Sequence, residues 1–459
     1  MSSSAAPSEL PTELTARAPL GFRRMRQIAG SGPLAFGGLV LLSLALAACS
    51  QEEPQPQPNV VLIVIDTLRA DRLGAYGCEP SPSPFLDRLA QRGVVCDPTR
   101  STSSWTAPAT ASLMTSLYPD QHGVHTGFLA TRERDAGGAT LELDRIPADI
   151  TTLAEVFQGA GYQTLAVTDN RNICHEMGFD QGFDAFHNLN NVGARAVNVQ
   201  VMAWKDRLRG ERPYLLYLHY MDPHRPYQFH GTKPEPSGDP RTDQLAAYDS
   251  EIGFVDARIR ELYEALGWDQ NTVLVVTADH GEEFQDHGGW DHGRTLYHEV
   301  IDVPLIWSFP GKGAPAGRWS GGASLLDVLP TLRGYLGLGR GEVDQGINLF
   351  PLMRDRALPP ERPLFAQLHS PPWFGSKTLD AVLQDSHKLI LDEPTGHELY
   401  DLFADPTERQ DLFEGSPHQA ESLQNALQAA KAGWKRWTPA KGSATLNDQQ
   451  LQNLRALGY

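Results

Sequence analysis

Three long runs of apolar residues, rich in β-branched and aromatic side chains, constrain the fold of this chain more than any other feature. They are NVVLIVID at 59–66, RPYLLYLHY at 212–220 and NTVLVVTAD at 271–279. Continuous apolar runs of this length are typical of strands buried on both faces. Helical patterns lie between them, for example at 244–266. Because strands alternate with helices, we predict an α/β fold with a mostly parallel or mixed sheet sandwiched by helices.

The pattern changes in a Gly- and Pro-rich segment near residues 338–363. Short apolar runs follow at 381–385 and 388–392, and a helical pattern occupies 418–437. We therefore predict a large α/β domain at 59–338 and a smaller C-terminal α+β domain at 339–459.

The N-terminal region has the pattern of an export signal. Three arginines at 23–26 precede an apolar run at 33–48, which is shorter than the roughly 20 residues of a membrane-spanning helix. The ending LALAAC resembles a bacterial lipoprotein signal. It implies a signal peptide at 1–48 and a lipidated Cys49. An ordinary signal with an incidental cysteine, or an uncleaved anchor, is the alternative.

Residues 49–58 alternate Pro and Gln, which predicts an extended tether between this anchor and the folded body. The expected location is the periplasmic side of the bacterial cell envelope, at the outer membrane. The start codon stays open between Met1 and Met25, because residues 1–24 do not resemble the opening of a signal. Once Cys49 is used, the odd number of remaining cysteines allows one disulfide at most, and this excludes a disulfide-stapled scaffold.

The net charge of −17 limits the possible partners. A nucleic acid held by phosphate contacts is excluded, because such binding requires clustered positive charge. A negatively charged substrate would need a local positive centre, such as a metal ion, to overcome the field of the protein.

Acidic and imidazole side chains stand where the predicted strands end. Asp66 closes the first run, and Asp279 with His280 closes the third. The carboxyl ends of parallel strands meet at one edge of a sheet, where open α/β proteins bind ligands. Carboxylate and imidazole donors suit Zn, Mn or another divalent ion. Taken alone, Asp66 is better explained as a loop cap, but together with the Asp279–His280 pair it is predicted to bind a metal.

More histidines lie in the Gly- and Pro-rich loops that follow the second and third runs. Loops of this kind carry binding and catalytic residues, because they cannot belong to the core. We predict functional roles for His224 and His292. The roles of three neighbours stay open between function and structure: His219, His287 and Asp291.

The stretch SSWTAPATASLMTS at 103–116 has the pattern of a loop that enters a helix. Thr106 followed by Pro108 suits a helix start, because Thr is a preferred cap and Pro is tolerated in the first turn. The same geometry aims a hydroxyl and free backbone N–H groups at an anion. Taken by itself, the stretch favours a structural cap and leaves an anion site as the alternative.

In series, these segments resemble the motifs of the bacterial sulfatase family, within the alkaline phosphatase superfamily. The resemblance rests on PNVVLIVIDTLRADRLGAYG, WTAPATASLMTSLYPDQHG, YMDPHRPY, TADHGEEFQDHG, HGRTLYHEVIDVPLIW and ELYDLFADPTERQDL, from about residue 59 to 412. It implies metal ligands and a nucleophile at the start of a helix. The residues that match these roles are Asp66, Asp279 and His280 for the metal and Thr106 for the nucleophile. His224 matches the active-site His of the Pro-His-x-Pro segment, and His292 matches a residue that contacts the transferred group.

The chain departs from this family pattern at the nucleophile. True sulfatases carry Cys or Ser there, which is oxidised to formylglycine, whereas this chain has Thr106. The Ser and Arg that follow in the same motif are replaced here by Ala109 and Thr110. We therefore expect no formylglycine. Thr67 also stands where many members have a second metal-binding Asp. A threonine nucleophile resembles the phosphodiesterase and phosphotransferase branches, which implies attack by Thr106 on phosphorus and a second metal held by Asp222, His224 and His292 or their neighbours.

The resemblance thus predicts a metal-dependent hydrolase of sulfate, phosphate or phosphonate esters, with phosphorus esters favoured. The cofactor would be Zn, Mn, Mg or Ca, and the substrate a small-molecule, lipid or glycan ester. A membrane-associated phosphotransferase is one alternative, and a lipoprotein that kept the fold but lost catalysis is another. The joint presence of the residues that match metal and nucleophile positions favours catalysis. The oligomeric state stays open.

Overall fold

The central sheet of the computed structural model has eight strands, in the order β12–β2–β11–β8–β1–β7–β5–β6. The structure describes residues 57–128, 140–369, 377–393, 396–445 and 452. The five strands from β8 to β6 run parallel, whereas β11 is antiparallel to β8 and β2. In sheet order the bounds are Gly317–Trp319, Val94–Cys96, Leu305–Ser308, Thr272–Thr277, Asn59–Ile65, Tyr214–Tyr220, Gln163–Thr168 and Ala185–Asn188.

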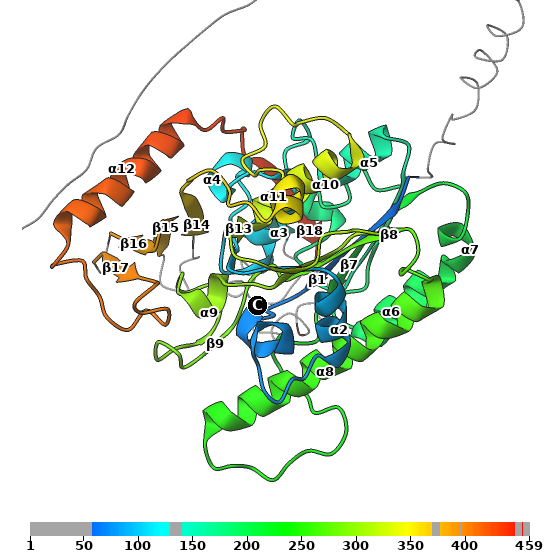
Figure 1. Ribbon diagram of the computed structural model, residues 1–459, viewed down its shortest axis with the longest axis horizontal. Helices are drawn as coiled ribbons and strands as arrows, with labels where there is room; N and C mark the ends of the chain where they lie inside the picture. The colour runs from blue at the N-terminus through cyan, green and yellow to red at the C-terminus, as the bar shows by residue number, and fades with distance from the viewer. Residues whose placement is uncertain (1–56, 129–139, 370–376, 394–395, 446–451, 453–459) are drawn as a thin grey trace, which may run out of the picture. The chain divides into compact units, whose positions relative to one another are not determined.

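Helices cover both faces of this sheet (Figure 1). One layer contains α2 (Pro84–Arg92), α6 (Ala194–Ala203) and α8 (Pro240–Leu266), and the other contains α3 (Thr106–Thr115), α5 (Leu153–Gly159) and α10 (Val328–Leu336). The three apolar runs form β1, β7 and β8, whose side chains are buried except at the first position of β1. The predicted helix–sheet–helix architecture is confirmed.

A smaller antiparallel sheet follows in the C-terminal region. Its strands are β14 (Leu364–His369), β15 (Thr378–Gln384), β16 (His387–Asp392) and β17 (Glu398–Asp401), and α12 (Pro417–Gly433) packs against β15 and β16. Leu423 and Leu427 of α12 share a core with Val382 and Leu389. The predicted C-terminal α+β unit is confirmed, and its boundary at residue 338 stays a prediction.

Shorter elements complete the described chain. Strand β18 (Ala440–Thr445) pairs with β4 (Thr140–Arg145), so the end of the described chain returns to the large α/β body. The other described α-helices and strands are α4 (Pro119–His122), α7 (Lys205–Leu208), α9 (His298–Ile301), α11 (Phe350–Asp355), β3 (Thr99–Arg100), β9 (Glu283–Phe284), β10 (Trp290–Asp291) and β13 (Ala323–Ser324).

The predicted signal peptide, Cys49 and most of the tether lie outside the described residues. Among the helices that the structure describes, none combines the length and the apolar character that crossing a membrane requires.

Candidate active site at the carboxyl ends of the central strands

Neighbouring parallel strands deliver polar side chains to one point at the edge of the sheet. Asp66 directly follows β1, Asp279 follows β8, and His219 lies near the end of β7. Asn170 follows β5. All four side chains are fully buried, and a donor atom from each of Asp66, His219 and Asp279 lies within 4.8 Å of the others. Such a cluster inside the fold is costly unless its charges are paired or coordinate a cation.

The Asp66 carboxylate is the hub of the cluster. Its Oδ2 accepts hydrogen bonds from His219 Nε2 at 3.0 Å, Asn170 Nδ2 at 2.6 Å and Thr106 Oγ1 at 3.4 Å. Burial alone would raise the pKa of Asp66, but the hydrogen bond and charge of His219 hold it well below its usual range. Asp66 is therefore a carboxylate at neutral pH.

Its second oxygen, Oδ1, has no hydrogen-bond partner within the described part of the chain, and neither has Asp279 Oδ2. His280 Nδ1 lies 2.9 Å from the carbonyl of Gly281, so it carries the proton and donates it there. The other nitrogen, Nε2, lies 3.8 Å from Asp66 Oδ1 and 3.6 Å from Asp279 Oδ2. Two unpaired carboxylate oxygens and one imidazole lone pair thus converge.

Burial shapes the protonation of this group. Burial raises the pKa of Asp279 well above its usual value, and the Asp66 charge adds to this rise. Burial lowers the pKa of His280 well below its usual value. A neutral imidazole beside two carboxyl groups is a donor set that suits a divalent ion. The residues present therefore fit the metal that the sequence predicts.

Thr106 is the first residue of α3, and the N-cap position belongs to Trp105. Its hydroxyl points to the cluster and lies 3.3 Å from both His280 Nε2 and Asn170 Nδ2. A local cap would instead turn the hydroxyl to a backbone N–H of its own helix. The structural cap that the local sequence favours is therefore wrong, because the strand ends provide the partners of this hydroxyl.

The two predicted histidines meet beside this group. The ring centroid of His292 lies 4.4 Å from that of His280 and 5.1 Å from that of His224. Glu282 Oε1 lies 3.0 Å from His292 Nδ1 and orients the ring. Burial lowers the pKa of His292, but the carboxylates of Glu282, Asp66 and Asp291 together outweigh burial and bring the net pKa above its usual value.

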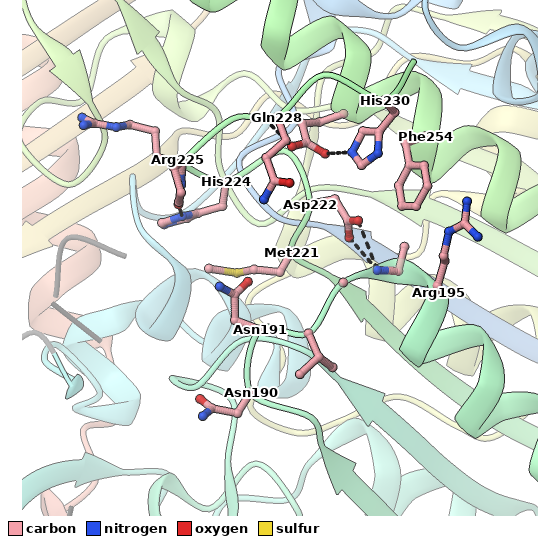
Figure 2. Close-up of a pocket in the computed structure, with 15 residues that line it drawn as sticks. Asn190, Asn191, Arg195, Met221, Asp222, His224, Arg225, Gln228, His230 and Phe254 are labelled. Atoms are coloured by element: carbon pink, nitrogen blue, oxygen red, sulfur yellow. Dashed lines mark hydrogen bonds and ion pairs between the residues drawn. The ribbon is translucent and has the colours of Figure 1, made fainter. Parts of the chain in front are cut away.

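Asp222 requires a correction. Its two oxygens accept from the backbone N–H of Ala194 at 3.1 and 2.9 Å, at the start of α6 (Figure 2). The helix start needs an acceptor, and Asp222 supplies it instead of joining the buried cluster. Thr67 also takes no ligand position: its hydroxyl donates to the Pro223 carbonyl at 3.0 Å.

The residues left open divide between function and structure. His219 joins the cluster through Asp66. His287 lies 2.8 Å from Glu299, and Asp291 pairs with Arg225, so both are held outside the cluster by other partners. Sequence reasoning missed Asn170 and Glu282. Asn170 could have been found, because the segment TDN that ends β5 repeats the pattern of a polar residue after a buried strand.

Comparison with known proteins settles the family. The chain matches the family model described as Sulfatase over residues 58–338, more than half of its length. The chain belongs to the sulfatase family. This sulfatase-family protein is therefore a hydrolase that acts on ester bonds.

Individual relatives of this sulfatase-family protein are distant. It is 28% identical to arylsulfatase A of Homo sapiens in an alignment of 456 residues. The alignment covers 81% of this chain and 86% of that protein. It is 23% identical to the uncharacterized sulfatase YidJ of Escherichia coli (strain K12) over 431 residues, or 78% and 83% of the two chains. One similar solved structure was determined in complex with its substrate D-glucosamine-2-N,6-O-disulfate. Its TM-score is 0.66 at 17% identity, and the match covers 87% of this chain and 99% of that one.

Asn170 offers a test of how the site is held together. Its amide bridges Asp66 and Thr106, so Asn170→Ala should lower kcat/KM by about 10- to 100-fold, as loss of an outer partner of a metal ligand does. Steady-state kinetics on an aryl ester will measure this. Asn198→Ala is a matched control, because Asn198 bonds to the Arg258 carbonyl on α8 and should leave kcat/KM within about twofold. Equal losses in both variants would contradict the assigned role.

Proposed function

We propose that this protein is a metal-dependent ester hydrolase in which Thr106 is the nucleophile, and that it prefers phosphorus esters, either diesters or phosphonate monoesters. One observation carries the proposal. The buried Thr106 hydroxyl contacts the Asp66 carboxylate, the His280 imidazole and the Asn170 amide at the same time. One backbone acceptor would satisfy a buried threonine that had only a packing role, whereas these three partners belong to the group that would hold the metal.

Asp66, Asp279 and His280 would hold the divalent ion through Oδ1, Oδ2 and Nε2 respectively. When bound, such an ion lowers the pKa of a nearby hydroxyl and neutralises negative charge on the transferred group. His219 orients the Asp66 carboxylate, because its hydrogen bond to Oδ2 leaves Oδ1 for the ion. Tyr217 in turn lies 2.9 Å from His219 Nδ1 and orients that ring.

The reaction then follows from the positions of the chain's own side chains. Asp66 Oδ2 accepts the Thr106 proton through the existing hydrogen bond, and Asn170 Nδ2 holds both atoms in register. A bond forms between Thr106 Oγ1 and phosphorus, and the bond between phosphorus and the alcohol oxygen breaks. His292, oriented by Glu282, donates a proton to the departing alcohol. In the second step His292 takes a proton from water as the water oxygen bonds to phosphorus. The bond between phosphorus and Thr106 Oγ1 breaks, and Asp66 returns its proton to Oγ1, which restores all three side chains.

The preference for phosphorus rests on the chemistry of the side chain. In the family pattern, formylglycine releases sulfate through its hydrate, a route closed to an unmodified threonine. A threonine ester must instead be cleaved by attack on the transferred atom, as in the phosphodiesterase branch that the sequence resembles. Glycan and lipid esters both stay within the substrate class at this level.

The experiment compares initial rates on matched aryl esters: sulfate, phosphate, phosphonate monoester and phosphate diester. The protein is stripped of metal and reloaded with Zn, Mn, Mg or Ca, and Thr106→Ala and Thr106→Ser are assayed beside it. The expected result is that phosphorus esters lead by orders of magnitude, that Thr106→Ala is inactive, and that Thr106→Ser keeps part of the rate. Faster turnover of sulfate with an active Thr106→Ala would overturn the nucleophile and the preference. Transfer only to an added alcohol would identify a phosphotransferase, and no turnover with metal bound would identify a protein that lost catalysis.

We also propose that Cys49 anchors the protein at the periplasmic side of the cell envelope. The signal-like segment at 1–48 and the tether at 49–58 support this. Expressed in a bacterial host, the protein should incorporate labelled fatty acid and fractionate with membranes. Cys49→Ser should remove the label and move the protein to the soluble fraction. An unlabelled protein that stays with the membranes would instead indicate an uncleaved anchor.

A further inference from the structure

A cavity of about 620 Å³ adjoins the reaction centre. Its walls come from the segment 190–195 before and at the start of α6, the loop after β7, and helix α8 (Figure 2). Met221 and His224 belong to this wall, and Met221 Sδ accepts a hydrogen bond from Asn170 Nδ2 at 3.2 Å. Asn170 also contacts Asp66 and Thr106. The cavity therefore lies next to the place where the ester group of a substrate would bind.

Two carboxylates at strand ends hold the segment 192–194 of this cavity in place. Asp169, which follows β5, accepts from the backbone N–H groups of Val192 and Gly193, both at 2.8 Å. Asp222 accepts from Ala194, the next residue along. The backbone N–H groups of three successive residues, 192–194, are thus held by the carboxylates that follow β5 and β7. This explains why Asp222 stands at the strand edge without joining the buried cluster.

Several polar side chains in the cavity are left with unused hydrogen-bonding groups. Among the described residues, no side-chain hydrogen bond or ion pair involves Asn190, Asn191, Arg195 or Gln228. The Arg195 guanidinium lies 5.4 Å from the centre of the Phe254 ring, and His230 stacks on the same ring at 3.8 Å. A cationic fork and three amides therefore face the space beside an aromatic surface.

No hydrogen bond or ion pair among the described residues joins Arg195 to the acidic residues of the cavity, which have other partners. Asp222 is engaged by Ala194, and Glu251 accepts from the Gln228 backbone at 2.6 Å and contacts His230 Nε2 at 2.5 Å. A second arginine, Arg225, is paired with Asp291. Arg195 is therefore the cation in this cavity whose charge the described residues leave without a carboxylate.

We propose that this cavity binds the alcohol part of the substrate, and that this alcohol is a sugar-sized polyol with an acidic substituent bound by Arg195. A guanidinium pairs with a carboxylate or acid ester through two parallel hydrogen bonds, and amides satisfy hydroxyl groups. A lipid chain would leave these donors without partners, at a cost in free energy for each. The proposal rests on the proposed function only in placing the ester bond at Thr106.

The test measures binding, so it needs no turnover. D-glucuronate and D-glucose are titrated into the metal-loaded full chain by ligand-observed NMR. Glucuronate should bind about 10-fold or more tighter than glucose, as expected for hydrogen bonds to a charged group. Arg195→Gln should reduce this preference to within about twofold, and Arg195→Lys should keep part of it in a salt-dependent manner. Arg207→Gln, on the exposed surface of α7, is the matched control and should keep the full preference.

Each outcome decides the proposal. An unchanged preference in Arg195→Gln, tighter binding of glucose, or no binding of either sugar would overturn it. Ester turnover measured on the same samples is a separate readout. Absence of turnover with an intact glucuronate preference would overturn the proposed reaction and leave the cavity assignment standing.

Discussion

Asp279→Asn should lower kcat/KM by at least about 10³-fold, which corresponds to the several kcal/mol that a bound cation contributes to a charged transition state. The substitution keeps the shape of the side chain and the acceptor for the His280 and Thr67 N–H groups. It replaces Oδ2, which is buried and has no hydrogen-bond partner among the described residues, with an amide nitrogen that has no lone pair to offer a cation. The loss should therefore fall on the metal and leave the fold intact.

Metal content after dialysis, measured by mass spectrometry, should fall together with activity. Asp256→Asn is the matched control, because Asp256 is an equally buried carboxylate that accepts from the Phe85 and Leu86 N–H groups at the start of α2. It should keep both metal and activity. An Asp279→Asn protein that retains its metal, or that loses less than about tenfold in kcat/KM, would show that Asp279 is not a ligand.

Lys388→Met should lower the free energy of unfolding by about 3 to 5 kcal/mol, the cost of leaving one buried charge without its partner. Lys388 on β16 lies 2.7 Å from Glu408 Oε1, and both side chains are at most 1% exposed. Glu408 also accepts from the His298 backbone at 2.9 Å. This ion pair therefore joins the C-terminal sheet to the segment that carries α9, and urea unfolding will measure its contribution.

Two further variants separate the charge from the packing. Lys388→Met with Glu408→Gln should recover most of the loss, because no unpaired charge remains and the Gln oxygen still accepts from His298. Lys441→Met is the control: that lysine pairs with Asp144 but is 48% exposed, so about 1 kcal/mol or less is expected. A loss below about 1 kcal/mol in Lys388→Met would contradict a dry ion pair.

The same pair predicts a pH dependence. Burial opposes ionisation, but Lys388 and His298 together lower the pKa of Glu408 from 4.5 to about 2. A carboxyl group whose folded pKa is depressed stabilises the fold above its unfolded pKa. The contribution of Glu408 should be complete above pH 4.5 and lost as the pH falls through 2. Glu408→Gln should remove this part of the acid dependence.

The large features of the fold were predictable because they depend on local patterns. A run such as the one at β1 is apolar on both faces, and only a strand between two helix layers buries both. Asp66 and the Asp279–His280 pair follow such runs directly, and this is why their convergence could be predicted before any contact was known.

The residues whose partners could not be predicted share another cause. Asp222 and Asp169 resemble Asp66 in sequence, since each ends a strand, but backbone N–H groups around α6 engage them. His219 points from within β7 to Asp66, a partner 153 residues away in the chain. Which donor a strand-end carboxylate accepts from depends on the loop that folding brings beside it, and the sequence alone does not show which loop that is.

By itself, the sequence determined the strand–helix alternation, the edge at which acidic and imidazole groups collect, and the presence of threonine where its family's motif has an oxidisable residue. Only the tertiary structure decided that the Thr106 hydroxyl faces Asp66 and His280 and does not cap α3. It also decided that Asp222 builds a cavity wall. The reason is physical: local patterns specify burial and backbone conformation, whereas the partner of a polar side chain depends on which distant strand end folding brings within hydrogen-bonding distance.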